Sequence, residues 1–328
     1  MTPSPAPSTS QTSPSAPAPR QPSLAAARLR DVTLRDGLQL TGRMLSAERK
    51  VALARELFAA GVPELEVGSM ARGDLVPPMA NTLEVLQALT PEELQRSWVW
   101  VATPRHVEKA AAAGARNFQY CFSASDAHNQ ANIGRSTEAS IAAMPDAVAL
   151  AQQAGGRIQL CIATSFTCPF DGPVNPDRVI EIANDPRTAG AADIVICDTL
   201  GQAHPGEVHA LVARVVAETP RRDVVFHGHD TWGAGVSNAL AAVLAGAVVV
   251  DGALGGLGGC PFAPGASGNT ATEDLLFAMR PDWLTPAAFA SIVRASEALL
   301  TELGEPNRSK ARQGARSKAP AFEWVLPS

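Results

Sequence analysis

The sequence is poor in cysteine, in charge and in tyrosine. Its 328 residues include five cysteines, an odd number with no CxxC pair, which argues against a disulfide framework. A reducing compartment fits this cysteine usage, so we expect the protein to be cytoplasmic. Charged residues make up 18% of the chain, the net charge is −5, and tyrosine occurs once. With no long basic run and one tyrosine for base stacking, we expect no nucleic-acid partner.

Long hydrophobic runs are also lacking. The longest mostly apolar stretch, residues 232–250, is interrupted by an asparagine and a glycine and lies between Asp230 and Asp251. A helix followed by a buried strand explains it better than a membrane span, so we expect no membrane association. Residues 1–27 contain Pro, Ser, Ala and Thr with almost no large apolar side chain and no secretion-signal core. We therefore predict a disordered tail at 1–27, in preference to a transit peptide.

From residue 28 onwards, strand-like and helix-like segments alternate regularly. Eight short apolar runs predict strands at about 29–34, 63–67, 97–102, 117–122, 157–163, 193–197, 223–227 and 247–251. Stretches with helical spacing lie between them at 46–60, 81–89, 104–113, 136–154, 176–184, 205–218 and 232–245. This alternation predicts a parallel sheet covered by helices, and eight strands close a (β/α)₈ TIM barrel. A doubly wound open sheet is the alternative, but no GxGxxG follows the first predicted strand.

The domain boundaries follow from this pattern. We expect a TIM-barrel catalytic domain at 28–304, with one or two extra C-terminal helices after about residue 284 lying over one end of the barrel. Residues 305–328 contain several lysines and arginines, and we expect them to form a solvated basic tail.

Polar side chains follow several of the predicted strands. In a TIM barrel the active site lies at the C-terminal ends of the strands. The residues at these ends include Arg35, Asp36, Glu66, Asp198, His227, His229, Cys260 and Asn269.

His227 and His229 give the sharpest signal among these residues. Residues two apart in a strand face the same side, so the two imidazoles point together. Closure of the barrel makes the first, second, seventh and eighth strands neighbours, which brings Asp36 and Asn269 to the same quadrant. A carboxylate, two imidazoles and an amide oxygen suit Mg²⁺ or Mn²⁺ better than a thiolate-rich structural zinc site.

The other polar residues allow more than one interpretation. Arg35 beside Asp36 is either a structural ion pair or a functional pair, and its place in a barrel mouth favours function. Glu66 lies among apolar neighbours and needs a partner such as Arg35 or the metal site. Asp198 is either an acid–base residue or the cap of the next helix. The glycine-rich segment 252–268, which contains Cys260, is either a phosphate-binding loop or a mobile lid.

Three other cysteines lie within predicted strands. Cys121, Cys161 and Cys197 are surrounded by apolar residues, and we expect them to be inert core residues. Cys168 lies in a loop beside a proline and stays ambiguous.

Several short motifs together resemble the 3-hydroxy-3-methylglutaryl-CoA lyase family, within the DRE-TIM metallolyases. They are found at 35–39 (RDGLQ), 65–67 (LEV), 76–79 (VPPM), 168–172 (CPFDG), 198–201 (DTLG), 227–231 (HGHDT) and 269–274 (NTATED). The resemblance covers about residues 29–280. It implies a metal bound by Asp36, His227, His229 and Asn269, and it implies Arg35, Glu66, Asp198 and Cys260 as catalytic residues.

The resemblance also implies an activity. A family member would cleave a 3-hydroxy-3-methylglutaryl-CoA-like substrate to acetyl-CoA and a ketone or keto acid, as in leucine degradation, with His227 or a nearby carboxylate accepting the hydroxyl proton.

Residues 69–73 (SMARG) depart from the usual Ser-Phe-Val-Ser-Pro, near the acyl or CoA end. Lyases for citramalyl-CoA or longer 3-hydroxyacyl-CoAs are therefore alternatives, as is a condensing acyl-CoA synthase. A non-catalytic barrel is disfavoured by the polar constellation, and a homodimer is our expectation for assembly.

Overall fold

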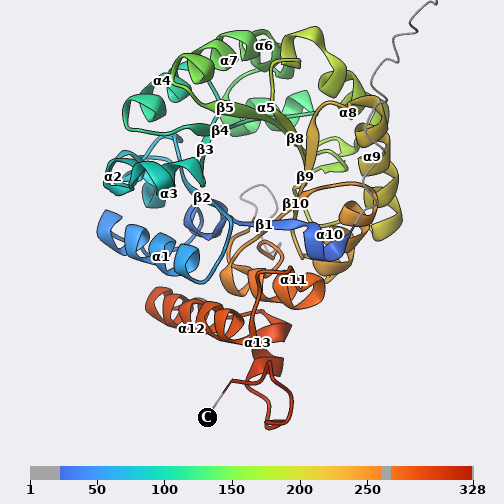
Figure 1. The fold of residues 1–328 in the computed structure, drawn as a ribbon. Helices are drawn as coiled ribbons and strands as arrows, with labels where there is room; N and C mark the ends of the chain where they lie inside the picture. The colour runs from blue at the N-terminus through green and yellow to red at the C-terminus, as the bar shows by residue number, and fades with distance from the viewer. Residues whose placement is uncertain (1–22, 260–266, 327–328) are drawn as a thin grey trace, which may run out of the picture.

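The computed structural model describes residues 23–259 and 267–326, and within them eight parallel strands form a closed barrel. The order around the barrel is β1-β10-β9-β8-β5-β4-β3-β2, so the first and last barrel strands of the chain are neighbours (Figure 1). The predicted TIM barrel is therefore confirmed. The strands are β1 (Arg28–Asp31), β2 (Glu64–Ser69), β3 (Ser97–Val101), β4 (Asn117–Ser123), β5 (Arg157–Ala163), β8 (Asp193–Asp198), β9 (Asp223–Gly228) and β10 (Val249–Gly252).

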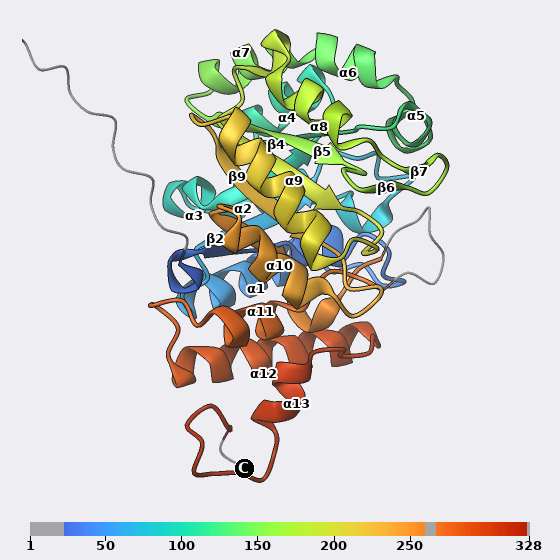
Figure 2. The ribbon, with the colours of Figure 1, turned by 90° about the vertical axis from the view of Figure 1, so that its right-hand side faces the viewer.

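Helices surround this barrel on the outside, as α9 over β9 shows in Figure 2. They are α1 (Ala47–Ala59), α2 (Thr82–Ala88), α3 (Pro91–Gln95), α4 (Pro104–Ala112), α5 (Asp126–Ile133), α6 (Thr137–Ala142), α7 (Met144–Gln153), α8 (Pro176–Asn184), α9 (Pro205–Glu218), α10 (Gly235–Leu244), α11 (Thr272–Met279), α12 (Pro286–Leu303) and α13 (Lys310–Ala315). Among the described residues no helix is long and apolar enough to cross a membrane, and α10 and β10 account for most of the apolar stretch 232–250.

Three local details differ from the sequence prediction. The helix expected at 136–154 is divided into α6 and α7, because Pro145 lies in the first turn of α7, where it lacks an N–H to continue a preceding helix. The first strand ends at Asp31 instead of near residue 34, and a π-helical turn, Thr33–Gly37, follows it. A two-stranded hairpin, β6 (Thr167–Cys168) with β7 (Gly172–Pro173), was not expected either.

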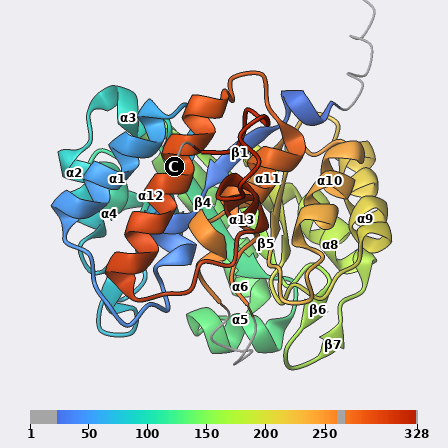
Figure 3. The same cartoon turned by 90° about the horizontal axis from the view of Figure 1, so that it is seen from below.

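The C-terminal segment is packed against the barrel, so the prediction of a solvated tail at 305–328 is wrong for the described part. Helix α12 lies beside the barrel against α1 and α11, not over its end, and α13 packs on α11 and α12 (Figure 3). The Trp324 side chain is buried against Phe277 and Phe289. The basic residues Arg312 and Arg316 both pair with Glu297 on α12. Apolar burial and these ion pairs together hold the segment in place.

The boundary of the N-terminal tail also needs correction. Residues 1–22 lie outside the described part of the chain, but Leu24–Ala26 form a 3₁₀ turn and Ala27 is buried in the main core. The turn contacts α10, and Leu24 packs against the core, which composition alone did not reveal.

Inward-facing side chains fill the barrel in layers, as they do in TIM barrels generally. On β4 and β5 the inward residues are Gln119 and Cys121, which pair in register with Gln159 and Cys161. The outward residues of the same strands, such as Phe118 and Leu160, belong to the core beneath the helices. A separate apolar cluster inside the barrel consists of Trp100, Ala102, Cys121, Cys161, Ala163, Val195, Cys197, Val225 and Val249.

Candidate active site

The turn after β1 carries Arg35 and Asp36 into the barrel mouth. This turn is anchored by Asp31, whose carboxylate accepts from the Thr33 backbone N–H at 3.0 Å and from the Thr272 hydroxyl at 2.6 Å. The Thr33 hydroxyl accepts in turn from the Leu254 N–H at 2.8 Å. The strand end, the turn and the segment after β10 are therefore fixed to one another, which gives Arg35 and Asp36 a rigid base.

Asp36, His227 and His229 form a buried group that could hold a metal ion. Each offers one ligand atom, and these atoms lie within 4.8 Å of one another. The Nε2 atom of His229 is 3.4 Å from Oδ2 of Asp36. Burial opposes the charge on Asp36, but the Arg35 guanidinium and His229 hold the pKa of that carboxyl well below its usual range. The expected convergence of the two histidines and Asp36 is what the structure shows.

His227 is oriented by a chain of buried polar groups. Its Nδ1 atom is 3.1 Å from Oδ2 of Asp251, so Nε2 is left to face the pocket that His227 lines. Both carboxylate oxygens of Asp251 also accept from Arg30, at 2.9 and 2.8 Å, and Arg30 donates to Gln159 at 2.8 Å. Arg30 and Asp251 are in-register partners on β1 and β10 and are almost completely buried. The charge of Arg30 holds the pKa of Asp251 below its usual range against the effect of burial.

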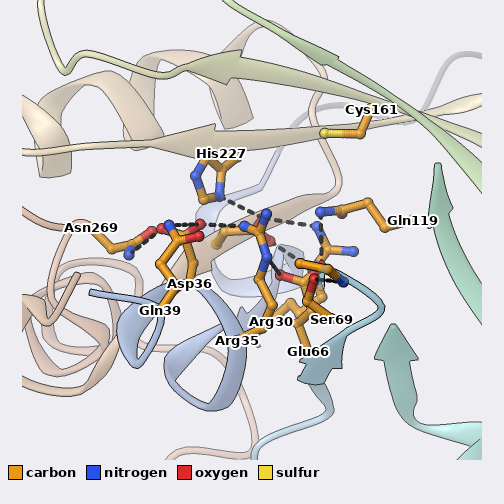
Figure 4. A network of polar contacts seen from close by, with 12 residues as sticks. Arg30, Arg35, Asp36, Gln39, Glu66, Ser69, Gln119, Cys161, His227 and Asn269 are labelled. Carbon is orange, nitrogen blue, oxygen red and sulfur yellow. Dashed lines mark hydrogen bonds and ion pairs between the residues drawn. The ribbon is translucent and has the colours of Figure 1, made fainter. Parts of the chain in front are cut away.

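Arg35, in the turn after β1, and Glu66, on β2, lie on one side of Asp36, and Asn269 lies on the other (Figure 4). Arg35 donates to Asp36, its Nε is 3.8 Å from Oε2 of Glu66, and its guanidinium lies 5.2 Å above the Trp100 ring. Glu66 accepts from Nε2 of Gln119 at 2.9 Å. Burial raises the pKa of Glu66 to about 7, with Arg35 opposing the shift. Arg35 is thus the partner that we expected a carboxylate among apolar neighbours to need. With this pKa, Glu66 can exchange a proton near neutral pH.

Asn269 lies against Asp36, on the side of the site away from Glu66. Its amide nitrogen donates to Oδ2 of Asp36 at 2.9 Å and to the Leu257 carbonyl at 3.0 Å. Its Oδ1 atom, like Nδ1 of His229, is buried and has no hydrogen-bond partner among the described residues. These contacts place the amide nitrogen of Asn269 towards Asp36. Turning the amide group over would exchange its two atoms and bring Oδ1 towards Asp36. An oxygen- and nitrogen-rich donor set with unpaired buried atoms fits a hard divalent cation.

The structure gives Asp198, one of the predicted catalytic residues, a capping role. The carboxylate of Asp198 accepts from the backbone N–H groups of Gln202 and Ala203, at 3.1 and 3.2 Å, so it caps the turn that follows β8. Its neighbour Thr199 lines the pocket instead. Cys260 lies outside the described residues, although Gly259, which precedes it, lines the pocket. The catalytic roles of Asp198 and Cys260 therefore stay predictions.

The three cysteines that we expected to be inert core residues also line this pocket. Cys121, Cys161 and Cys197 lie on β4, β5 and β8, facing the cavity into which Arg35 and the histidines point. A groove continues outward from the same cavity, sharing Arg35, Gln39, Trp100 and Asn132 with it. Its apolar lining includes Leu40, Ala71, Leu75, Val76, Met79, Ala102 and Ile133.

The sequence alone did not predict the buried polar residues that lie behind the site. Arg30 and Asp251 are 221 positions apart and meet only because β10 closes the barrel against β1. A signal was present, since an arginine and an aspartate at inward positions of apolar strands need partners when buried. Without the strand register, no residue could be named as that partner.

Comparisons with known proteins agree with this geometry. A family model described as HMGL-like matches residues 26–299. The (R)-citramalyl-CoA lyase of Chloroflexus aurantiacus is 38% identical over 287 residues, covering 84% of this chain and 90% of that one. The 3-hydroxy-3-isohexenylglutaryl-CoA/hydroxy-methylglutaryl-CoA lyase of Pseudomonas aeruginosa is 33% identical, covering 89% of this chain and 98% of that one. An HMG-CoA lyase structure from Acinetobacter baumannii, in complex with coenzyme A and 3-methylmalate, has a TM-score of 0.83 and 30% identity, covering 90% and 97% of the two chains.

The fold and the site thus define a TIM-barrel protein with a buried group of side chains, at the C-terminal ends of its strands, that could hold a metal ion. The family match covers most of the chain, and the chain belongs to the HMGL-like family.

Proposed function

We propose that this protein is a carbon–carbon lyase that cleaves a 3-hydroxyacyl-CoA of the 3-hydroxy-3-methylglutaryl-CoA type. The products are acetyl-CoA and a keto acid, acetoacetate for the glutaryl substrate. The observation that carries this proposal is the buried group Asp36, His227 and His229 beside Arg35 in the barrel mouth. Family membership and the lyase names of the relatives support it.

We infer that Asp36, His227, His229 and Asn269 hold Mg²⁺ or Mn²⁺ when the enzyme is loaded. Such an ion supplies Lewis-acid chemistry that acidifies the substrate hydroxyl. The orphaned Oδ1 of Asn269 and the close approach of the other three ligand atoms support this assignment.

The side chains of this site suit the bond changes of a retro-Claisen cleavage. A base removes the hydroxyl proton, the bond between the carbinol carbon and the thioester α-carbon breaks, and its electron pair passes to the thioester as an enolate. The carboxylate of Glu66, whose pKa is about 7, is the candidate acceptor of the proton, because Nδ1 of His227 is bonded to Asp251 and its Nε2 would be the metal ligand. The Arg35 guanidinium can hold the enolate oxygen. Cys260, which the resemblance implies as a catalytic residue, is the candidate that returns a proton to the α-carbon.

The groove beside the cavity supports an acyl-CoA as the partner. It leads from Arg35 and Trp100 towards solvent, where Leu40 and Leu75 are exposed. A groove with this apolar lining that ends at the reacting groups suits a flexible pantetheine arm. The same groove could accept a long alkyl substituent, so longer 3-hydroxyacyl-CoAs stay an alternative. A condensing synthase would use the same groups in the reverse direction.

Citramalyl-CoA is a second candidate substrate, favoured by the 38% identity to the Chloroflexus enzyme. Its carboxylate is attached directly to the carbinol carbon. Among the described residues that line the cavity, Arg35 is the sole arginine or lysine, and it already contacts Asp36 and Glu66. A carboxylate close to the carbinol carbon would lie beside the proposed metal ligands, whereas a more distant one would need another partner.

One assay tests the proposal and separates these candidates. Purified protein is incubated with Mg²⁺ or Mn²⁺ and with 3-hydroxy-3-methylglutaryl-CoA, citramalyl-CoA or a longer 3-hydroxyacyl-CoA, and acetyl-CoA release is followed. We expect cleavage that is lost after exhaustive chelation and restored by the ion. His229→Ala should remain folded but lose calorimetric metal binding. Full activity after chelation, or no cleavage of any substrate in the panel, would contradict the proposal. A cytoplasmic location, a homodimer and a role in leucine degradation stay predictions.

A further inference from the structure

One side of the active-site cavity is made of thiols. We use the name thiol wall for Cys121, Cys161 and Cys197 together with Ala163, which lie on the neighbouring strands β4, β5 and β8 and line the cavity. Cys121 and Cys161 are in-register partners, and the sulfur atoms of Cys161 and Cys197 are 3.4 Å apart. All four side chains are buried. The wall is therefore a continuous surface and not a set of isolated cysteines.

The opposite side of the cavity carries the charges. Arg35 and Asp36 reach it from the turn after β1, which faces β5 across the closed barrel, and Cys161 lies apart from Asp36 and Asn269 in Figure 4. His227 on β9 borders the wall, because it is the in-register neighbour of Cys197 on β8. The thiol wall itself is neutral, because the hydrogen bond with Cys161 and burial raise the pKa of the Cys121 thiol well above its usual value. Buried thiols behave as small apolar groups with weak hydrogen bonding. The cavity thus has a charged side at Arg35 and Asp36 and a neutral side centred on Cys161, and His227 and Cys197 meet where the two sides join.

We propose that the thiol wall binds the alkyl substituent on the carbinol carbon of the substrate and sets the size of substituent that the enzyme accepts. This inference rests on the proposed function, in which the hydroxyl and the thioester oxygen face the charged side. A tetrahedral carbinol carbon held in that way directs another substituent across the cavity, towards Cys161 and its neighbours. The wall then determines substrate specificity, and its residues lie outside the family motifs given above.

The chemistry of the wall decides which substituent faces it. A carboxylate placed against neutral, buried thiols would lose its hydration without gaining a charged partner, which is costly. A methyl group placed there loses nothing and gains dispersion contacts with polarisable sulfur. The substrate class that fits is therefore a 3-hydroxyacyl-CoA with a small alkyl group on the carbinol carbon and its carboxylate directed away from the wall.

Cys161 is the residue to change, because it contacts both of the other thiols. Cys161→Ala removes the sulfur atom and deepens the wall, and Cys161→Leu fills the space. Val249→Ala is the matched control, since Val249 belongs to the same apolar cluster inside the barrel but does not line the cavity. Thermal unfolding of each variant reports whether it folds.

The experiment compares kcat/KM for three CoA thioesters that differ only in hydrogen, methyl or ethyl on the carbinol carbon. One methylene in an apolar pocket changes kcat/KM by roughly 10-fold or more. We expect Cys161→Ala to raise the ethyl-to-methyl ratio by about 10-fold, and Cys161→Leu to lower the methyl-to-hydrogen ratio by a similar factor. Val249→Ala should lower the melting temperature without changing either ratio.

The outcomes separate this inference from the proposed function. If the wild-type enzyme cleaves the methyl substrate but both ratios stay within about 2-fold in folded Cys161→Ala, the wall does not contact the substituent and the inference is wrong. The alanine variant keeps this test open even where Cys161→Leu fails to fold. If the wild type cleaves none of the three thioesters, the proposed function itself is wrong and the inference falls with it.

Discussion

His227 is tied to Asp251 by a 3.1 Å contact between Nδ1 and Oδ2, and this contact decides which nitrogen of the imidazole faces the pocket. A neutral histidine that donates from Nδ1 keeps its lone pair on Nε2, the form required of a metal ligand or a base. Arg30 holds Asp251 through both of its carboxylate oxygens, so the carboxylate cannot turn away from the ring. The orientation of His227 is thus set by Asp251 and, behind Asp251, by Arg30.

We predict that Asp251→Asn weakens metal binding by about 10- to 100-fold, the range typical of losing a carboxylate behind a histidine ligand. The measurement is calorimetric titration of the metal-free protein with Mn²⁺, supported by the ¹⁵N NMR shifts of the His227 ring. Asp193→Asn is the control, because Asp193 is also a buried barrel aspartate but contacts Gln159 instead of a histidine. Equal metal affinity in Asp251→Asn and the wild type would show that Asp251 serves stability alone.

We predict that Arg35→Lys lowers kcat by roughly 10²- to 10³-fold, the usual effect of losing one donor to a developing oxyanion. Lysine keeps the charge but cannot present the planar guanidinium that contacts Asp36 and lies over Trp100. Steady-state kinetics and thermal unfolding are measured on the same preparation. A large fall in melting temperature with a near-normal kcat would identify Arg35 as a structural residue.

We predict that Cys260→Ser lowers turnover steeply and leaves KM almost unchanged, because serine has similar size but is a far weaker acid than a thiol. A thiol reagent should inactivate the wild type, and a competitive acyl-CoA should protect it. The other four cysteines are buried, so the first modified residue should be Cys260, which peptide mass analysis can check. Wild-type turnover in Cys260→Ser would leave Asp198, Glu66 or bound water as the candidate proton donor.

The fold was predictable from the sequence because its signals are local and repeated. All eight barrel strands begin and end within a few residues of the predicted runs, and Pro104 and Pro205 begin α4 and α9 as expected. The spacing of His227 and His229 placed them on one face without any knowledge of the fold. Barrel closure then located Asp36 beside them.

The interior of the barrel was not predictable in the same way. From the sequence we expected Cys121 and Cys161 to be core cysteines. An inward position in a barrel strand has the same apolar neighbours along the chain whether it lies in the filled core or at the floor of a cavity. The height of a residue along the barrel axis depends on the stagger of the strands, which no single strand encodes. For the same reason, neither Arg30 nor Gln119 could be assigned its partner.

We predict that a chain beginning at Ser23 keeps the melting temperature and specific activity of the full-length protein, whereas a chain beginning at Arg28 loses stability. The difference lies in the 3₁₀ turn Leu24–Ala26 and in Ala27, which is buried in the core. Thermal unfolding and acetyl-CoA release are compared for the two truncated chains. If the chain from Arg28 is as stable as the other, the contacts of this turn with α10 contribute nothing.

Glu273 gives a prediction about pH. Its side chain is fully buried on α11 and accepts from the Gly255 backbone N–H, and burial raises its pKa to about 7. The neutral acid is therefore favoured in the folded state. In the unfolded chain the same group ionises near its ordinary value of about 4.5. As pH rises from about 4.5 to 7, the unfolded state releases this proton before the folded state does, so Glu273 progressively destabilises the fold.

Glu273→Gln removes this penalty while keeping the size and an oxygen acceptor. We expect the variant to be more stable than the wild type by about 1–3 kcal/mol at pH 8, and the difference to vanish near pH 4. Glu297→Gln is a control of opposite sign, because the ion pairs with Arg316 and Arg312 lower the pKa of Glu297. That variant should be less stable than the wild type at pH 8, with the deficit shrinking as pH falls. Denaturant unfolding across this pH range measures both, and a pH-independent gap between Glu273→Gln and the wild type would show that the carboxyl of Glu273 does not titrate as the structure implies.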